Sequence, residues 1–368
     1  MSKLIGVMDE DPFNYLTWSG SSKYFFEALQ AHNALSAGIS AEASKFSQRA
    51  AQIGTFHPNM EKWKFAYHLN TGLYDAMTRT AKRKIAELDY DYDTIVQVGA
   101  WYDLVRPDVT NISYHDGNLA TLLASPFGYP QISKNRINKA LAYEKRLYDR
   151  LDFIFPMSHW LGKSFIKDFG ANENKVIPVG AGINLPKILD TTNRAYDKKR
   201  LLMVGKDFTR KGGDTLLSAF KKVLKAVPNA ELRIIGPVLD DVPEGVKCLG
   251  FISKNDPQGL DKLLEEYANA SVFVIPSLYE PFGISFAEAM AHRVPCIGTN
   301  ICAMPEIIQD GVTGYVVPPH DVDTLAARLI EILSSEEQCK EMGEAGFKHY
   351  KENYTWDIVT KKILDTIK

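Results

Sequence analysis

Short apolar runs alternate with longer amphipathic segments through the second half of the chain. The apolar runs are Leu201–Val204, Leu232–Ile235, Val272–Ile275, Cys296–Gly298 and Tyr315–Val317. The amphipathic segments between and after them cover residues 215–226, 260–268, 285–292 and 322–333. Strands and helices that alternate at this spacing form βαβ units, in which parallel strands are buried between helices. The sequence therefore predicts a doubly wound α/β domain that binds ligands at the carboxyl ends of its strands.

The first half repeats this pattern less regularly. Strands are expected at Leu4–Met8, Thr94–Val98, Asn111–Tyr114, Phe153–Pro156 and Val176–Val179, and helices at Ser22–Ser36, Lys64–Leu88 and Asn135–Asp149. A chain of 368 residues is too long for one compact core. We expect two Rossmann-like domains whose parallel sheets face each other across a cleft, the first covering residues 1–183 and the second 184–354.

Composition narrows the classes of protein that this chain can be. The formal net charge is only -2, so no global basic field indicates a nucleic-acid partner. Four cysteines without a CxxC pair predict reduced thiols: Cys248, Cys296, Cys302 and Cys339. The N-terminus lacks the features of a signal peptide, and no apolar run approaches the roughly 20 residues of a membrane span. We expect a cytoplasmic protein that is at most peripheral at the inner membrane face.

One basic segment, Lys62–Lys84, has two interpretations. Its only acid is Asp75, and its cations are Lys62, Lys64, Arg79, Lys82, Arg83 and Lys84. A solvated helix face is the favoured interpretation. A basic face for an anionic acceptor or a membrane surface is the alternative.

The most informative stretch runs from Pro276 to Glu288. A strand is expected to end at Pro276, a loop to carry Glu280, and a helix to begin around Gly283. The first N–H groups of a helix lack intrahelical partners and carry a positive dipole, so they bind phosphate, and glycine allows close backbone approach. Glu288 lies about 7.5 Å further along the helix axis. This spacing suits Glu280 for binding sugar hydroxyls and Glu288 for binding those of a ribose.

The pattern E-P-F-G-x-x-x-x-E over residues 280–288 resembles the signature of the retaining glycosyltransferases of group 1 (GT4), which have the GT-B fold. The stretch 201–213 is similar to the strand and loop whose Arg and Lys hold the donor diphosphate. The resemblance implies that Arg210 and Lys211 have this role, with Lys206 as an alternative to Arg210. Residues 232–252 resemble the base-binding strand and loop, and residues 305–318 also match. Ile301–Met304 departs from the family, where many members carry a Gly-Gly turn.

The first half carries a looser resemblance. Thr17–Ser22 precedes a helix as the family's glycine-rich loop does, but only Gly20 remains of the usual glycine pair. Ile112–Asp116 resembles the strand end whose histidine meets the transferred sugar, which implies a sugar contact for His115. The closing segment 355–368 resembles the family's final helix, which returns to the first domain.

The resemblance implies a hexosyltransferase that retains anomeric configuration. We expect no catalytic metal, because the helix end with Arg210 and Lys211 can supply the positive field. The enzyme's co-substrate would be a nucleotide sugar, with a UDP-sugar favoured and GDP-mannose next, and its acceptor a small molecule, a glycan or a glycolipid. The residues implied in catalysis are His115, Glu280, Arg210 and Lys211. The residues implied in donor binding are Gly20, Lys206, Gly236, Gly250, Phe251, Glu280, Phe282, Gly283, Ile284, Ser285 and Glu288.

Several other classes of protein compete with this interpretation. Asp9–Asp11 spells D-x-D, but it follows the first expected strand, where a polar edge or an acceptor contact is favoured over a metal site. A dehydrogenase would need G-x-G-x-x-G after a strand, and Gly180–Gly182 lacks the third glycine. No local motif suggests the cofactor lysine of a phosphorylase. A nucleotide-sugar epimerase and a non-catalytic nucleotide-sugar-binding protein of the same fold stay open, and donor turnover would separate them from a transferase.

Overall fold

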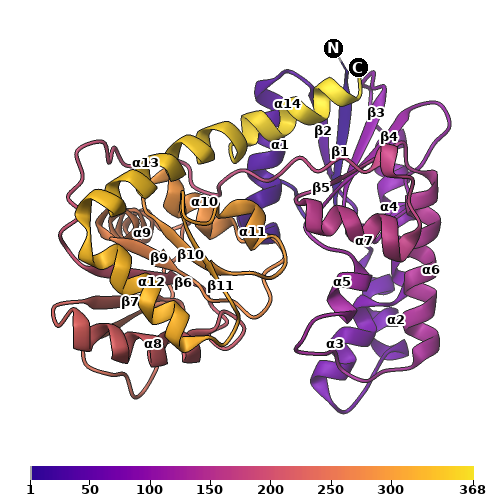
Figure 1. The fold of residues 1–368 in the computed structure, drawn as a ribbon. Coiled ribbons are helices and arrows are strands. Elements are labelled where there is room, and N and C mark those ends of the chain that lie inside the picture. Colours follow the sequence, from indigo (N-terminus) through magenta and orange to yellow (C-terminus); the bar gives the residue numbers. More distant parts are fainter. Residues whose placement is uncertain (1) are drawn as a thin grey trace. The chain divides into compact units, whose positions relative to one another are not determined.

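A computed structural model describes residues 2–368 and divides the chain into two compact units. The first unit extends to Gly180 and includes Trp356–Lys368, and the second covers Ala181–Thr355. The expected boundary followed residue 183. Each unit is built on one parallel β-sheet with helices packed against it (Figure 1), which confirms the α/β fold class.

The sheet of the first unit has the strand order β2-β1-β3-β4-β5, and all of its pairs are parallel. Its strands are β1 (Leu4–Met8), β2 (Leu35–Ser40), β3 (Thr94–Val98), β4 (Thr110–His115) and β5 (Phe153–Pro156). The order changes direction between β1 and β3, so the loops after these two strands flank the crevice where open α/β sheets bind ligands.

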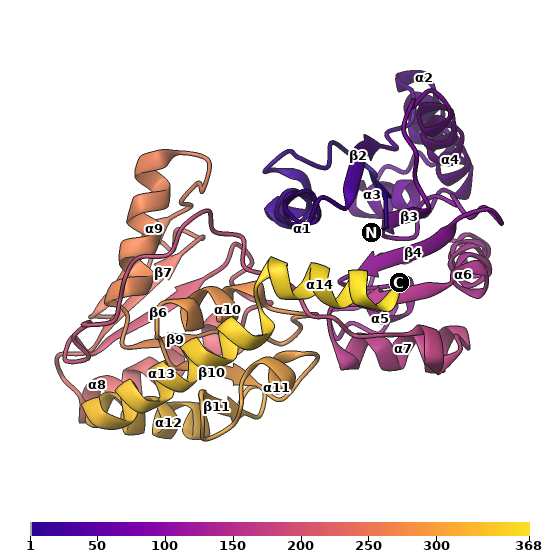
Figure 2. The same ribbon diagram turned by 90° about the horizontal axis from the view of Figure 1, so that it is seen from above.

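Eight α-helices surround this sheet in the described part of the first unit. They are α1 (Ser21–Ala31), α2 (Lys45–Gly54), α3 (Met60–His68), α4 (Thr71–Ala86), α5 (Leu119–Leu123), α6 (Lys134–Arg150), α7 (His159–Phe169) and α14 (Trp356–Thr366). The closing helix α14 packs against α1, where the rings of Phe25 and Trp356 lie 5.9 Å apart (Figure 2).

Three expected elements of the first unit were wrong. The helix expected to reach Ser36 ends at Ala31, because Asn33 adopts a left-handed conformation (φ 54°) that stops a helix, and β2 follows. The helix expected over Lys64–Leu88 is divided by Asn70, whose side chain accepts hydrogen bonds from the first N–H groups of α4. Val176–Val179 forms only one isolated bridge, between Val176 and Ile154, and no strand.

The second unit confirms every strand expected from its sequence. Its sheet has the order β11-β10-β9-β6-β7-β8, from β6 (Arg200–Val204), β7 (Glu231–Ile235), β8 (Val246–Gly250), β9 (Val272–Val274), β10 (Cys296–Thr299) and β11 (Gly314–Val317). Its helices are α8 (Gly213–Ala226), α9 (Pro257–Asn269), α10 (Ile284–Ala291), α11 (Met304–Ile307), α12 (Val322–Ser334) and α13 (Glu336–Asn353). The order changes direction between β6 and β9, which predicts a ligand site at the loops that follow them.

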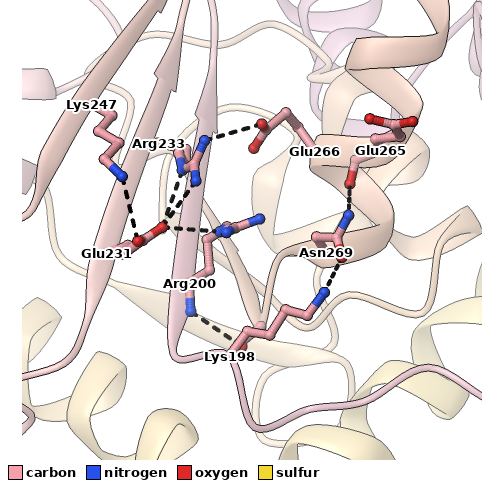
Figure 3. A network of polar contacts seen from close by, with 9 residues as sticks. Lys198, Arg200, Glu231, Arg233, Lys247, Glu265, Glu266 and Asn269 are labelled. Atoms are coloured by element: carbon pink, nitrogen blue, oxygen red, sulfur yellow. Dashed lines mark hydrogen bonds and ion pairs between the residues drawn. The ribbon is translucent and has the colours of Figure 1, made fainter.

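A network of ion pairs lies at the amino ends of β6 and β7 (Figure 3). Glu231 Oε2 accepts hydrogen bonds from Arg200 Nε at 3.3 Å and Arg233 Nη2 at 3.1 Å, and Lys247 Nζ lies 3.6 Å from Glu231 Oε1. Arg233 Nη1 also lies 3.3 Å from Glu266 Oε1 on α9. These contacts join three strands and a helix at the sheet edge opposite the switch-point loops.

All four cysteines are free thiols. None of the helices that the structure describes combines the length and the apolar content that crossing a bilayer requires.

Candidate active site

The switch point of the second sheet brings together two loops, residues 205–212 after β6 and residues 275–283 after β9. Leu278 N donates a hydrogen bond to Arg210 O at 2.8 Å and so joins the loops. Gly212 has a left-handed backbone (φ 72°), and a Cβ atom there would lie 1.9 Å from Pro276 O. Only glycine allows this approach, so the loop sequence itself fixes the two loops against each other.

Three charged side chains meet where these loops touch. Lys211 Nζ donates to Glu280 Oε2 at 2.7 Å, and Arg210 Nη1 lies 3.5 Å from the same oxygen. Arg210 Nη1 also donates to Tyr279 O at 2.7 Å, and Ser277 Oγ to Glu280 Oε2 at 3.4 Å. We call Arg210, Lys211 and Glu280 the switch-point triad; three of the four side chains expected in catalysis lie in it.

The two cations of the triad lower the pKa of Glu280. Burial acts to raise the pKa of Glu280, but Lys211 and then Arg210 outweigh it and hold that pKa below its ordinary value. The carboxylate is therefore ionised at neutral pH. Arg210 Nε also donates to Asp207 Oδ2 at 3.3 Å, so the two cations are shared between two carboxylates, and Lys211 and Arg210 are the cations that the site can offer to an anionic ligand.

Helix α10 begins beside the triad. Gly283 is its N-cap in a left-handed conformation (φ 89°), and no side chain caps the helix. The first N–H groups, from Ile284 and Ser285, are thus the donors that a helix N-terminus offers to a phosphate. The side chain of Phe282 is buried, with its ring 6.2 Å from that of Tyr354, so Phe282 can meet a donor only through its backbone.

The second expected carboxylate, Glu288, lies inside α10 and is buried. Its Oε1 accepts from Lys254 Nζ at 2.5 Å and its Oε2 from Tyr267 Oη at 3.0 Å. Lys254 also donates to Asn184 O at 3.3 Å. Sequence reasoning missed Lys254 and Tyr267 as partners of Glu288. The position of Lys254 in the loop after β8, three residues beyond Phe251, was the available signal.

The ends of β7 and β8 carry the residues expected around a nucleobase. Phe251 is exposed, and Lys206 Nζ lies 4.4 Å from the centroid of its ring. Gly236 N donates to Gly250 O at 3.0 Å, and a Cβ atom at Gly236 would lie 2.0 Å from Gly205 O. The structure places Arg210 beside Glu280 and Lys206 beside Phe251, so the two cations offered for one role lie in different parts of the site.

The loop after β10 reaches the same triad. Thr299 Oγ1 donates to Ser277 O at 2.5 Å. Burial raises the pKa of the Cys302 thiol, and a hydrogen bond with the backbone of Glu280 partly offsets that shift. Cys302 has a left-handed backbone (φ 48°), a conformation that glycine adopts more readily. Residues 301–304, which replace the Gly-Gly turn of many family members, therefore keep the backbone turn but place the Cys302 side chain at the site.

His115 lies at the end of a strand, as expected, but its side chain is buried. It is the last residue of β4, is only 2% exposed, and its ring packs 5.6 Å from Tyr148 and 5.0 Å from Phe165. Burial lowers its pKa to about 3, and its Nε2 has no hydrogen-bond partner among the described residues. In this structure the side chain packs into the aromatic cluster between α6 and α7, and the sugar contact that the resemblance implied stays a prediction.

Polar groups do gather at the carboxyl ends of β1 and β4. Trp18 Nε1 donates to Asp116 Oδ2 at 2.7 Å, a pair that sequence reasoning missed. Trp18, Ser19 and Gly20 all have left-handed backbones before α1, and such conformations in residues other than glycine are typical of functional turns. Burial, followed by repulsion from Glu10, raises the pKa of Asp9 to about 6.

Residues 2–368 contain no group of three or more His, Cys, Asp or Glu side chains that could hold a metal ion.

Comparison with known proteins agrees with this geometry. The model of the family described as glycosyl transferases group 1 matches residues 186–349, which contain both switch-point loops. The chain is 26% identical over 242 residues to D-inositol 3-phosphate glycosyltransferase of Corynebacterium diphtheriae (60% of this chain, 56% of that protein). It is 27% identical over 268 residues to a GDP-mannose-dependent alpha-(1-6)-phosphatidylinositol monomannoside mannosyltransferase of Mycobacterium tuberculosis (67% and 69%).

The fold has a solved counterpart over its full length. Sucrose-phosphate synthase from Thermosynechococcus elongatus superposes with a TM-score of 0.69 at 17% identity, covering 99% of this chain and 98% of that one. The chain spans about half the length of the first curated relatives that it matches. The motif, the switch-point geometry and these matches agree: residues 186–349 form a domain of the group 1 glycosyltransferase family, and the chain has the GT-B fold.

Proposed function

We propose that this protein transfers a hexose from a nucleoside-diphosphate sugar to an acceptor, with retention of anomeric configuration and without a metal ion. The observation that carries the proposal is the switch-point triad beside the N-terminus of α10, which has no side-chain cap. The cations of the triad and the N–H groups at the start of α10 both favour binding of a phosphate group beside Glu280.

The triad and the helix would hold the donor diphosphate. Charge-assisted hydrogen bonds from cations such as Arg210 and Lys211 contribute about 1.5–3 kcal/mol each. They stabilise the leaving diphosphate more than the intact donor, because charge accumulates on it as the glycosidic bond breaks. The two cations and the helix dipole supply the positive charge that a metal ion supplies in other enzymes.

Glu280 would bind hydroxyl groups of the transferred sugar. Its carboxylate is ionised and held by Lys211 at 2.7 Å, so it is fixed in one orientation before the donor arrives. Retention is the family's stereochemistry. We propose front-face displacement assisted by the departing phosphate, because no carboxylate of the first unit stands out as a nucleophile in its sequence.

The nucleoside would lie toward Glu288 and Phe251. Glu288 would accept hydrogen bonds from the ribose, with Lys254 and Tyr267 holding its carboxylate in place. Exposed Phe251 offers a ring on which a base can stack, and backbone groups near Gly250 would read its edge. We favour a UDP-sugar as donor. GDP-mannose, which is the donor in the name of the mycobacterial relative, is second.

The first unit would bind the acceptor, which we propose to be a small molecule, a glycan or a glycolipid. The curated relatives are named for inositol phosphate and phosphatidylinositol mannoside acceptors. The Trp18–Asp116 pair and the carboxyl group of Asp9 are polar groups that the first unit offers at the carboxyl ends of β1 and β4.

A donor-turnover experiment tests this proposal. Purified protein is incubated with UDP-glucose, other UDP-hexoses or GDP-mannose, with EDTA present, and the fate of the sugar is followed by NMR. Transfer or slow hydrolysis that releases the sugar as its α-anomer from an α-donor supports a retaining, metal-independent transferase. Isomerised nucleotide sugar would indicate an epimerase, and binding without turnover would indicate a non-catalytic nucleotide-sugar-binding protein.

A further inference from the structure

Helix α2 of the first unit presents its apolar side chains to solvent. Phe46 is 82% exposed and Ile53 78% exposed, and Ala51 is the only buried residue of the helix. Phe46, Arg49, Ala50 and Ile53 follow the spacing i, i+3, i+4 and i+7, so they lie on one face. A helix of a globular domain normally turns such a face toward the core, and α2 turns it outward.

The exposed face continues beyond α2 into the start of α3. Phe56 is 68% exposed and Met60 55% exposed. The ring of Phe56 lies 5.6 Å from that of Trp63, whose Nε1 donates to Gln52 O at 2.9 Å, so this end of the face is held in place. Helices α2 and α3 contact each other, and α2 also contacts α4 (Figure 1). We call Phe46, Ile53, Phe56 and Met60 the apolar face.

Cations surround the apolar face. Residues 42–87 hold eight Lys and Arg residues against four acids, although acids outnumber these cations in the whole chain, 45 to 43. Lys45, Arg49 and Lys64 are exposed beside the apolar face, and Arg49 lies between Phe46 and Ile53 on the same side of α2. The acids in this part of the segment are Glu42, which accepts a hydrogen bond from Gln48, and Glu61.

We propose that the apolar face docks this protein onto an anionic lipid surface. Large apolar side chains that lie among Lys and Arg on a short amphipathic helix match the interface of a bilayer with acidic headgroups. A second copy of the chain fits less well, because pairing two such faces would bring Arg49 and Lys45 of both copies together. Of the basic segment Lys62–Lys84, the proposal includes Lys64, and it adds Lys45 and Arg49 of α2.

The experiment is a vesicle flotation assay with the full chain. One set of vesicles contains phosphatidylcholine alone, and the other contains phosphatidylcholine and phosphatidylglycerol in equal parts. The protein is expected to float with the anionic vesicles and to be released by added salt, because surface charge is screened. The double variant Phe46→Ser/Ile53→Ser should lower the bound fraction by about tenfold, since it removes the inserted side chains.

A matched control replaces exposed apolar side chains elsewhere in the first unit. Tyr90→Ser/Ile166→Ser should float as the wild type does, because both residues are exposed but lie outside the apolar face. Circular dichroism melting of each variant shows that it is folded. Lys45→Gln/Arg49→Gln should weaken binding to anionic vesicles and reduce its dependence on salt.

Three results would overturn the proposal. The wild type could fail to float with anionic vesicles, or the control could lose binding as much as Phe46→Ser/Ile53→Ser does. Sedimentation could instead show a dimer that this double variant dissociates, which would make the face an interface between copies. Nucleotide binding without vesicles is measured separately, so failure of the membrane proposal is distinct from failure of the proposed transferase activity.

Discussion

The second-unit sheet carries a cluster of charges at each of its two edges. At the amino edge, Glu231 contacts Arg200, Arg233 and Lys247, and Arg233 continues to Glu266 (Figure 3). At the carboxyl edge, Glu280 contacts Lys211 and Arg210. Both clusters combine carboxylates with cations, so the residue types alone do not distinguish a structural network from a binding site.

The difference lies in what surrounds each cluster. The amino-edge residues begin regular strands and bond across β6, β7, β8 and α9. The carboxyl-edge residues lie on two loops joined at Gly212, next to a helix N-terminus that lacks a side-chain cap. The carboxyl edge thus offers the first N–H groups of a helix to a ligand, as a phosphate site requires.

The largest expected effect separates the two edges directly. Arg210→Ala should lower turnover by about 10²–10³-fold, as loss of one charge-stabilising donor does, because the leaving diphosphate loses a cation. The matched variant Arg233→Ala removes an arginine from the amino edge and should leave turnover per folded molecule unchanged. Steady-state kinetics of both variants decide the point, and a loss below threefold for Arg210→Ala would end its assigned role.

His115 of the first unit contrasts with the switch-point triad. It also lies at the carboxyl end of a strand, but its side chain is buried. Its pKa in the folded state, about 3, lies below the ordinary 6.5, so the unfolded chain takes up the proton first. Stability should therefore fall as pH drops below 6.5, by on the order of 2 kcal/mol between pH 7.5 and pH 5. Urea unfolding at several pH values should show this loss reduced in His115→Phe; equal pH slopes in both proteins would contradict a neutral core histidine.

Glu288 on α10 and Glu266 on α9 allow a test of donor binding. Glu288→Gln should raise the dissociation constant of the nucleoside diphosphate by about tenfold, since a neutral amide accepts weaker hydrogen bonds from the ribose. Glu266→Gln, the matched change at the amino edge, should leave that constant unchanged. Isothermal titration calorimetry measures both. Unchanged affinity with lost turnover in Glu288→Gln would count against a ribose role.

The smallest effect concerns stability alone. Glu231→Gln should lower the free energy of unfolding by about 1 kcal/mol, because a partly exposed carboxylate that joins several cations contributes little more than that. Its nucleotide affinity should equal that of the wild type. A variant with unchanged stability and weakened nucleotide binding would reverse the roles given to the two edges.

The sequence predicted the second unit well because its strands are buried and bounded by turn residues. The spacing of Glu280, Gly283 and Glu288 also located a strand end and a helix start. The short strand β2 was missed because its residues, Leu35–Ser40, include a glycine and two serines and show no clear alternation. The break at Asn70 was missed because the helical periodicity continues on both sides of it.

The sequence did not predict which way the side chains of the site point or which residues they contact. His115 has the expected position at the end of β4, but its ring points toward Tyr148 and Phe165. Lys254 and Tyr267 reach Glu288 from a loop and a helix that are distant in sequence. Such contacts depend on how the elements pack against one another, which residue spacing within one element does not specify.

A thermal-shift titration with UDP, GDP, ADP and CMP tests the central claim most directly, with wild type, Arg210→Ala and Arg233→Ala compared. A ligand at 100 times its dissociation constant adds about 2.7 kcal/mol to folded-state stability. We predict that one nucleoside diphosphate raises the melting temperature of the wild type and of Arg233→Ala, and does so much less for Arg210→Ala. No shift with any nucleotide, or an equal shift in all three proteins, would contradict a nucleotide site at the carboxyl edge of the second sheet.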